Sequence, residues 1–178
     1  MFTHNVPLWV GEFGPVYTGD PEKDEMRYQI VKDQLEYYDK YKASWCIWLY
    51  KDMGLQAIMH QNDDTEYMKL VSEFLVRKNS LGADAWGSTD KDIRTVMQPI
   101  EELFKKEFPA YDPYPNGQQK KINLLVRHIL ISEALVPEYC NLFKDLTDEK
   151  LTALAQSFLF KNYVKRSRLE DILTGREK

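Results

Sequence analysis

Two short apolar segments joined by one helical segment constrain the fold of this chain most. Residues 7–14 run Pro-Leu-Trp-Val-Gly-Glu-Phe-Gly, and residues 43–50 run Ala-Ser-Trp-Cys-Ile-Trp-Leu-Tyr. Short apolar runs that end in turn residues are typical of buried parallel strands. Residues 20–42, between them, carry apolar side chains at helical spacing. This order predicts two adjacent parallel strands joined by a right-handed crossover.

The predicted helix has clear start and stop residues. Asp20 is a typical N-cap, Pro21 suits the first helical position, and Glu22 places a negative charge in the first turn. Lys40 and Lys42 place positive charge where the helix dipole favours it, at the C-terminal end. We therefore expect the helix to begin after Asp20 and to close at these lysines.

Two parallel strands do not make a stable sheet alone, because such strands need cover on both faces and further neighbours. The chain has 178 residues, whereas a complete (β/α)₈ barrel takes roughly 250. We therefore expect sequence upstream of this chain to complete the sheet. We expect this chain to have the missing N-terminal portion of the barrel as a partner.

The second half of the chain has a different character. Apolar side chains at helical spacing mark residues 93–104, 122–135 and 151–159, and residues from about 81 onward indicate helices only. Pro99 lies inside the first of these stripes, so we expect a break or a kink near Gln98. The sequence thus divides into an α/β part, residues 1–80, and an all-helical part, residues 81–178.

Composition argues against several classes of function. The net charge is −4, and the basic surface of a phosphate binder is missing, so we expect no nucleic-acid partner. No apolar run is long enough to span a membrane, so we expect no membrane partner. The two cysteines form no disulfide framework and have no metal-ligand neighbours at useful spacing. We expect no metal and no cofactor, and localisation stays open between a cytoplasmic and a secreted parent.

Glu12 is the most informative side chain. A glutamate at the end of a buried apolar strand is costly unless it is exposed at a rim or paired. Gly11 and Gly14 beside it allow a ligand or another backbone to approach closely. In a barrel, the carboxyl end of a strand belongs to the catalytic face. Two interpretations follow, a catalytic carboxylate or a strand-end glutamate that bridges to a lysine or arginine.

The second strand offers an aromatic partner for Glu12. Trp48 has the same parity as Cys46 and Tyr50, whereas Trp45 points to the other face. We therefore expect Trp48 to face the same cavity as Glu12 and Trp45 to pack against helices.

Three further residues are candidates for contact with a substrate. Lys51 and Asp52 follow the second strand and are placed to touch a substrate hydroxyl, with a solvated turn as the alternative. Tyr17 follows the first strand and is a candidate for the border of the cleft.

Residues 9–14, Trp-Val-Gly-Glu-Phe-Gly, resemble the seventh-strand motif of glycoside hydrolase family 5, the cellulase-like clan of (β/α)₈ enzymes. The longer strings P-L-W-V-G-E-F-G-P-V-Y and S-W-C-I-W-L-Y-K-D-M-G are similar to fungal members. The resemblance covers residues 1–80, and residues 81–178 resemble the C-terminal extension of such proteins with weaker motifs. It implies an α/β fold, the last two βα units of a TIM (β/α)₈ barrel, followed by an all-helical C-terminal extension.

The resemblance also implies an activity, the retaining hydrolysis of O-glycosyl bonds in a β-linked polysaccharide or glycoside. It makes Glu12 the catalytic nucleophile and Trp48 the tryptophan that lines the sugar subsite at the cleavage point. Retaining hydrolysis needs a second carboxyl group about 5 Å away as acid/base. In the family this is a glutamate after an asparagine, and the present sequence has no Asn-Glu pair. We expect the chain to supply the nucleophile for a carbohydrate substrate and to be inactive alone.

Two alternatives without catalysis stay open on the sequence. One is a helical interaction module, and the other is a glycan-binding module that keeps Trp48 as a stacking platform.

Overall fold

The computed structural model describes residues 6–53, 56–83, 89–114 and 117–175, which fall into two compact units. Unit 1 contains residues 1–65 and 154–178, and unit 2 contains residues 66–153. Unit 2 is thus inserted into the chain of unit 1. This division differs from the one expected at residue 80, because the C-terminal segment packs with the N-terminal strands.

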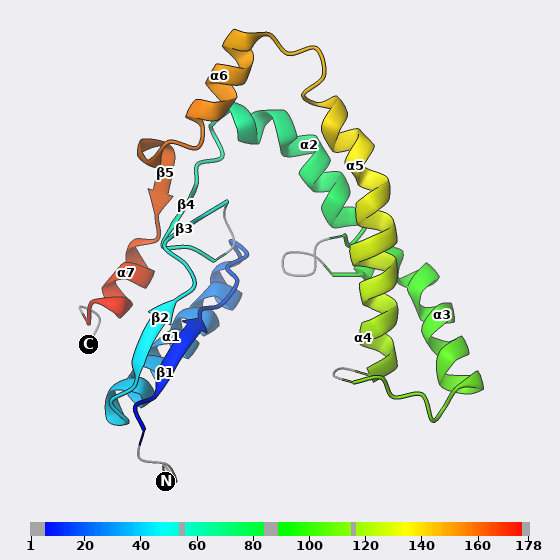
Figure 1. Cartoon of the computed structure of the whole chain (residues 1–178), viewed down its shortest axis with the longest axis horizontal. Coiled ribbons are helices and arrows are strands. Elements are labelled where there is room, and N and C mark those ends of the chain that lie inside the picture. Colours follow the sequence, from blue (N-terminus) through cyan, green and yellow to red (C-terminus); the bar gives the residue numbers. More distant parts are fainter. Residues whose placement is uncertain (1–5, 54–55, 84–88, 115–116, 176–178) are drawn as a thin grey trace. The chain divides into compact units, whose positions relative to one another are not determined.

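A parallel strand pair is the base of unit 1 (Figure 1). Strands β1 (Trp9–Phe13) and β2 (Ser44–Ile47) pair in parallel and are joined by helix α1 (Pro21–Lys40). The predicted order of strand, helix and parallel strand is confirmed. Neither of the two sheets in the described residues closes into a barrel. The membership of these strands in a (β/α)₈ barrel stays a prediction.

Helix α1 begins as its sequence predicts. The side chain of Asp20 accepts hydrogen bonds from the backbone N–H groups of Glu22 and Lys23, at 3.2 and 3.3 Å. Pro21 occupies the first helical position, where a backbone donor is not needed.

Asp24 ties the loop between β1 and α1 to the helix. Its carboxylate accepts hydrogen bonds from the backbone N–H groups of Thr18 and Gly19, each at 2.8 Å, and from the guanidinium group of Arg27 at 3.1 Å. Burial acts to raise the pKa of Asp24, but these hydrogen bonds and the Arg27 charge outweigh it and hold the pKa below its ordinary value.

A small three-stranded sheet completes the strands of unit 1. Strands β3 (Lys51–Asp52), β4 (Met59–Gln61) and β5 (Tyr163–Lys165) lie in that order, with β4 and β5 antiparallel. Strand β5 lies in the segment expected to be helical only, so that expectation is wrong. Three residues are too few to show a strand period, and β5 forms because β4 offers it an edge.

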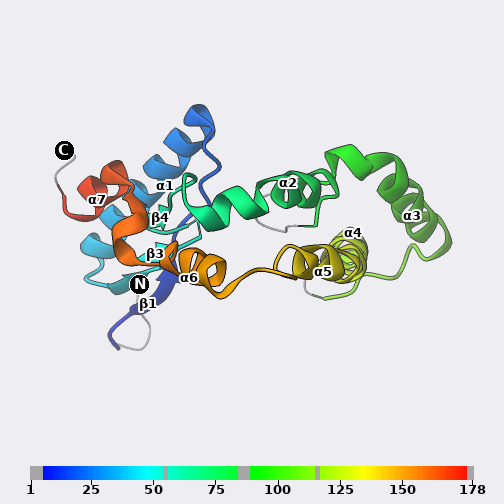
Figure 2. The same cartoon turned by 90° about the horizontal axis from the view of Figure 1, so that it is seen from above.

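The core of unit 1 lies between the strand pair, α1 and the C-terminal helix α7 (Ser167–Leu173). Figure 2 shows α7 beside α1. The buried cluster of this core consists of Phe13, Tyr17, Val31, Leu169 and Ile172. Helix α7 therefore covers a strand that precedes it by more than 150 residues in the chain.

Unit 2 is helical in its described part. Helix α2 (Glu66–Ser80) packs against α5 (Ser132–Asn141), and α3 (Arg94–Glu107) packs against α4 (Gly117–Asn123). A π-helical segment, Leu124–Ile131, links α4 to α5. Helix α6 (Asp148–Gln156) leads back to unit 1. Among the described residues, no helix is both long and apolar enough to cross a membrane.

Helix α3 runs through Pro99 without interruption, so the break expected as one of two outcomes near Gln98 does not occur, and the kink stays a prediction. Proline lacks the N–H group that the carbonyl of Thr95 needs. Both residues are exposed, so water can satisfy that carbonyl and the helix continues.

Replacement of Asp24 by asparagine tests the role of its carboxylate. We expect Asp24→Asn to lower the free energy of unfolding at pH 7 by about 1–3 kcal/mol, because the charged acceptor of the Thr18 and Gly19 N–H groups is lost. The folded-state pKa lies below that of the unfolded chain, so this stabilisation is present above pH ~4 and disappears as the pH falls toward the folded pKa. Urea unfolding at pH 7 and pH 3 measures it, with the exposed Asp33→Asn as control; an equal loss at both pH values contradicts the assignment.

Candidate functional site

A bulge interrupts the register of the β1–β2 pair. Val10 lies opposite Trp45 and Phe13 lies opposite Ile47. Two residues of β1 therefore stand between these pairs, against one residue of β2. An extra residue of this kind bends the strand and changes the direction of the side chains beside it.

The bulge decides which way Glu12 points. Along a regular strand, Glu12 shares a face with Val10, which packs against the core. The extra residue instead places Phe13 in the core, where it is 7% exposed, and leaves Glu12 exposed. Bulges of this type are common beside active sites because they aim a functional side chain.

The ends of the two strands are held together just after the bulge. The backbone N–H of Trp48 donates to the carbonyl oxygen of Phe13 at 2.7 Å. Gly14 has a φ of +145°, and a Cβ atom added to it meets the Trp48 carbonyl oxygen at 2.5 Å. The predicted close approach beside Glu12 is therefore a contact between Gly14 and the backbone of Trp48.

The prediction that Trp45 packs inward is confirmed, and the cavity shared by Trp48 and Glu12 stays a prediction. Trp45 faces the core and makes an edge-to-face contact with Phe13, with ring centroids 5.5 Å apart. Trp48 and Cys46 lie on the opposite, exposed side, and Trp48 is 46% exposed.

The exposed side of the strand pair thus carries a carboxylate and large aromatic surface. Trp9 is 65% exposed, and Trp48 and Glu12 are also open to solvent. Glu12 forms no ion pair within the described residues.

Lys51 and Asp52 make contacts within unit 1, and their role in substrate contact stays a prediction. The ammonium group of Lys51 donates to the carbonyl oxygen of Phe158 at 2.7 Å and lies 4.2 Å from the Tyr163 ring centroid. The carboxylate of Asp52 accepts from the backbone N–H of Met53 at 2.7 Å. Lys51 thus ties β3 to the returning chain, and Asp52 shapes its own turn.

Tyr17, a candidate for the border of a cleft, lies in the core of unit 1. Its ring belongs to the core cluster and is 1% exposed. Burial raises the pKa of Tyr17, and the neighbouring Tyr28 adds to this effect. The guanidinium group of Arg166 lies 4.7 Å from its ring centroid. The run Ser167-Arg168-Leu169-Glu170 has the pattern of a capping box and predicts a short last helix, which α7 confirms. Sequence reasoning missed the contact of Arg166 with Tyr17 and the packing of α7 against it.

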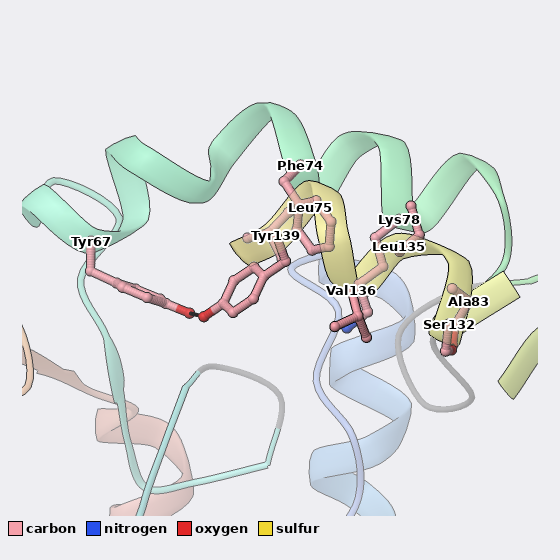
Figure 3. Close-up of a pocket in the computed structure, with 9 residues that line it drawn as sticks. All are labelled: Tyr67, Phe74, Leu75, Lys78, Ala83, Ser132, Leu135, Val136 and Tyr139. Carbon is pink, nitrogen blue, oxygen red and sulfur yellow. Dashed lines mark hydrogen bonds between the residues drawn. The ribbon is translucent and has the colours of Figure 1, made fainter. Parts of the chain in front are cut away.

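Unit 2 contains a cavity of about 340 Å³ between α2 and α5, which the sequence did not predict (Figure 3). The hydroxyl groups of Tyr67 and Tyr139 meet there at 2.8 Å, and burial raises the pKa of Tyr67. The lining is mostly apolar, as in many ligand pockets, and it contains no carboxylate. The lining residues are Tyr67, Phe74, Leu75, Lys78, Ala83, Ser132, Leu135, Val136 and Tyr139.

The chemistry available in the described residues is that of one exposed carboxylate beside tryptophan surfaces. No three His, Cys, Asp or Glu side chains come together there as a metal site requires. A lone carboxylate can act as a nucleophile or stabilise a positive charge. It cannot also supply the acid and base of a hydrolytic cycle.

The contact between Gly14 and Trp48 predicts a large cost for any side chain at position 14. We expect Gly14→Ala to destabilise unit 1 by about 3 kcal/mol or more, because it adds a backbone clash to an unfavourable φ. Gly19→Ala is the matched control, since Gly19 has a φ of +79° with no atom within 4 Å of an added Cβ, and should cost about 1 kcal/mol. Urea unfolding followed by tryptophan fluorescence measures both, and equal losses would contradict the proposed contact.

Comparison with known proteins adds one relative. The chain is 44% identical, over 186 aligned positions, to a curated protein of Phanerodontia chrysosporium named Beta-xylosidase. The match covers 98% of this chain and 39% of the relative, so the chain spans about two fifths of the relative's length. No family model matches the chain, and no solved structure matches it. The chain is therefore similar, along nearly all its length, to a segment of a protein named for a glycosidase activity.

Proposed function

We propose that this chain is the C-terminal part of a retaining glycoside hydrolase of family 5 and that Glu12 is its nucleophile. The observation that carries the proposal is the bulge that exposes Glu12 at the end of a buried parallel strand, beside Trp48. The similarity to a protein named Beta-xylosidase supports glycosidase chemistry and suggests a β-xyloside as substrate.

The arrangement around the strand pair fits two units of a barrel. In a (β/α)₈ barrel, helices cover the outer side of each strand and the other side faces the interior. Here the core elements α1 and α7 lie on one side of β1 and β2, while Glu12, Cys46 and Trp48 lie on the exposed side. The relative extends well beyond the matched segment, which leaves room for the remaining units.

The proposed reaction has two steps. The Glu12 carboxylate attacks the anomeric carbon, the bond to the leaving oxygen breaks, and a second carboxyl group protonates that oxygen. Water then attacks the glycosyl ester, the second carboxylate takes its proton, and Glu12 is released with retained configuration in the sugar. The second carboxyl comes from the rest of the barrel. Trp48 offers its exposed indole face to the sugar bound at the cleavage point.

A second candidate function is binding without catalysis. Two observations favour it, the aromatic cavity in unit 2 and the exposed tryptophans of unit 1. A module of this kind binds a sugar or glycoside and does not depend on the carboxylate of Glu12.

A chimera tests the catalytic proposal. We exchange the matched segment of the Phanerodontia chrysosporium protein for this chain and expect hydrolysis of an aryl β-xyloside. Glu12→Gln should lower kcat at least about 10³-fold, because the attacking carboxylate is lost. Glu22→Gln, at an exposed glutamate in the first turn of α1, is the control and should leave kcat unchanged.

Chemical rescue separates the two candidate functions. Azide should restore turnover to Glu12→Ala in the chimera and give the α-xylosyl azide, because azide attacks from the side that the carboxylate occupied. Full activity of Glu12→Gln would contradict the role of Glu12. Xyloside binding without turnover in the folded chimera would favour the binding module.

Cysteine labelling tests the barrel itself. Cys46 lies on the side of β2 that a barrel encloses, and it is exposed in the described structure, as is Cys140 of unit 2. We expect both to react with a bulky thiol reagent in the isolated chain. In the chimera Cys46 should be protected while Cys140 still reacts, as peptide mass spectrometry can measure. Equally fast labelling of both in a folded chimera would contradict the barrel.

A further inference from the structure

The two ends of the inserted unit 2 meet at one buried side chain. Gln61 of β4 is 2% exposed. Its amide nitrogen donates to the hydroxyl oxygen of Thr65 at 3.1 Å and to the carbonyl oxygen of Ser157 at 2.8 Å. Thr65 is the last residue of unit 1 before the insertion, and Ser157 lies just after the return. Unit 1 therefore holds both ends of the insertion through its own residues.

The returning chain is tied to unit 1 before α7 begins. Strand β5 pairs with β4, and the backbone N–H of Arg166 donates to the carbonyl oxygen of Ile58 at 2.8 Å. The guanidinium Nε of Arg166 donates to the carbonyl oxygen of Ala57 at 3.0 Å. These contacts fix the place where α7 starts.

Helix α7 then packs two apolar side chains into the core cluster that contains Phe13. Leu169 is fully buried and Ile172 is 6% exposed, and both belong to the same cluster as Phe13. On the surface of the helix, Arg168 forms an ion pair with Glu25 of α1. The position of Phe13 in the core thus depends on residues that follow unit 2.

We propose that α7 is a positioning element for Glu12, acting through Phe13, and that unit 2 is an insertion which this role does not need. Glu12 points outward only because the bulge sends Phe13 inward, and a shift of register reverses side-chain faces. Leu169 packs in the same cluster as Phe13 and stabilises its buried position, because both remove apolar surface from water. Only the catalytic meaning of the Glu12 orientation rests on the proposed function.

The place of the insertion agrees with this role. The chain leaves unit 1 after β2 and the short strands β3 and β4, and α7 comes back to cover the strand pair. Loops that follow the carboxyl ends of strands are where barrels vary without change to the barrel itself. Helix α7, and not α2, therefore completes the second strand–helix unit.

Hydrogen exchange and NMR of the full chain test the proposal. The reporter is the backbone N–H of Trp48, which bonds the carbonyl of Phe13. We expect Leu169→Ala to speed its exchange at least about tenfold and to shift the folded-state resonances of Glu12 and Gly14. The control Leu135→Ala removes a buried leucine of unit 2 (4% exposed) and should speed exchange only in unit 2. Leu169→Met should restore the wild-type resonances.

Each outcome decides the proposal without any measurement of catalysis. Faster exchange at Trp48 with unchanged Glu12 and Gly14 resonances would reduce α7 to a structural role and overturn the positioning claim. If Leu169→Ala speeds exchange in unit 2 and leaves the Trp48 N–H unchanged, α7 stabilises unit 2 instead of the strand pair, and the proposal is overturned. If Leu169→Ala does not fold, the milder Leu169→Met and the Leu135→Ala chain still show whether units 1 and 2 exchange independently. If either variant speeds exchange equally in units 1 and 2, the claim that unit 2 is an independent insertion is overturned.

Discussion

The burial of Phe13 is the interaction on which the candidate site depends. The bulge in β1 turns this ring into the core and thereby turns Glu12 out to solvent. Just after it, the hydrogen bond from Trp48 to the Phe13 carbonyl and the bare backbone of Gly14 hold the two strand ends together. One apolar side chain thus links the stability of unit 1 to the outward direction of Glu12.

The sequence predicted the features that local patterns determine. Strand and helix periods located β1, α1 and β2, Asp20 marked the helix start, and strand parity separated Trp45 from Trp48. It did not predict features that depend on distant contacts. Lys51 bonds a carbonyl 107 residues away, and Tyr17 is buried because Arg166 and α7 return to cover it. The bulge was also missed, since a single extra residue changes no pattern that a strand of five residues can show.

The residues of the candidate site all lie in unit 1. Unit 1 has Glu12, the exposed tryptophans and helix α7, which packs against Phe13, although 88 residues of unit 2 interrupt it. The second carboxyl group of a retaining mechanism has to come from outside the described strand pair. This requirement is consistent with a relative of which the chain covers only 39%.

The central claim, that Glu12 is a glycosidase nucleophile, is tested most directly by trapping the glycosyl ester. An activated 2-deoxy-2-fluoro-β-xyloside slows the second step of retaining hydrolysis and leaves the sugar on the nucleophile. With the chain in place of the matched segment of its relative, digestion and mass spectrometry should find the label on Glu12 in the peptide that contains residues 9–14. A turnover-competent chimera that is labelled at another residue, or is not labelled, would contradict the account.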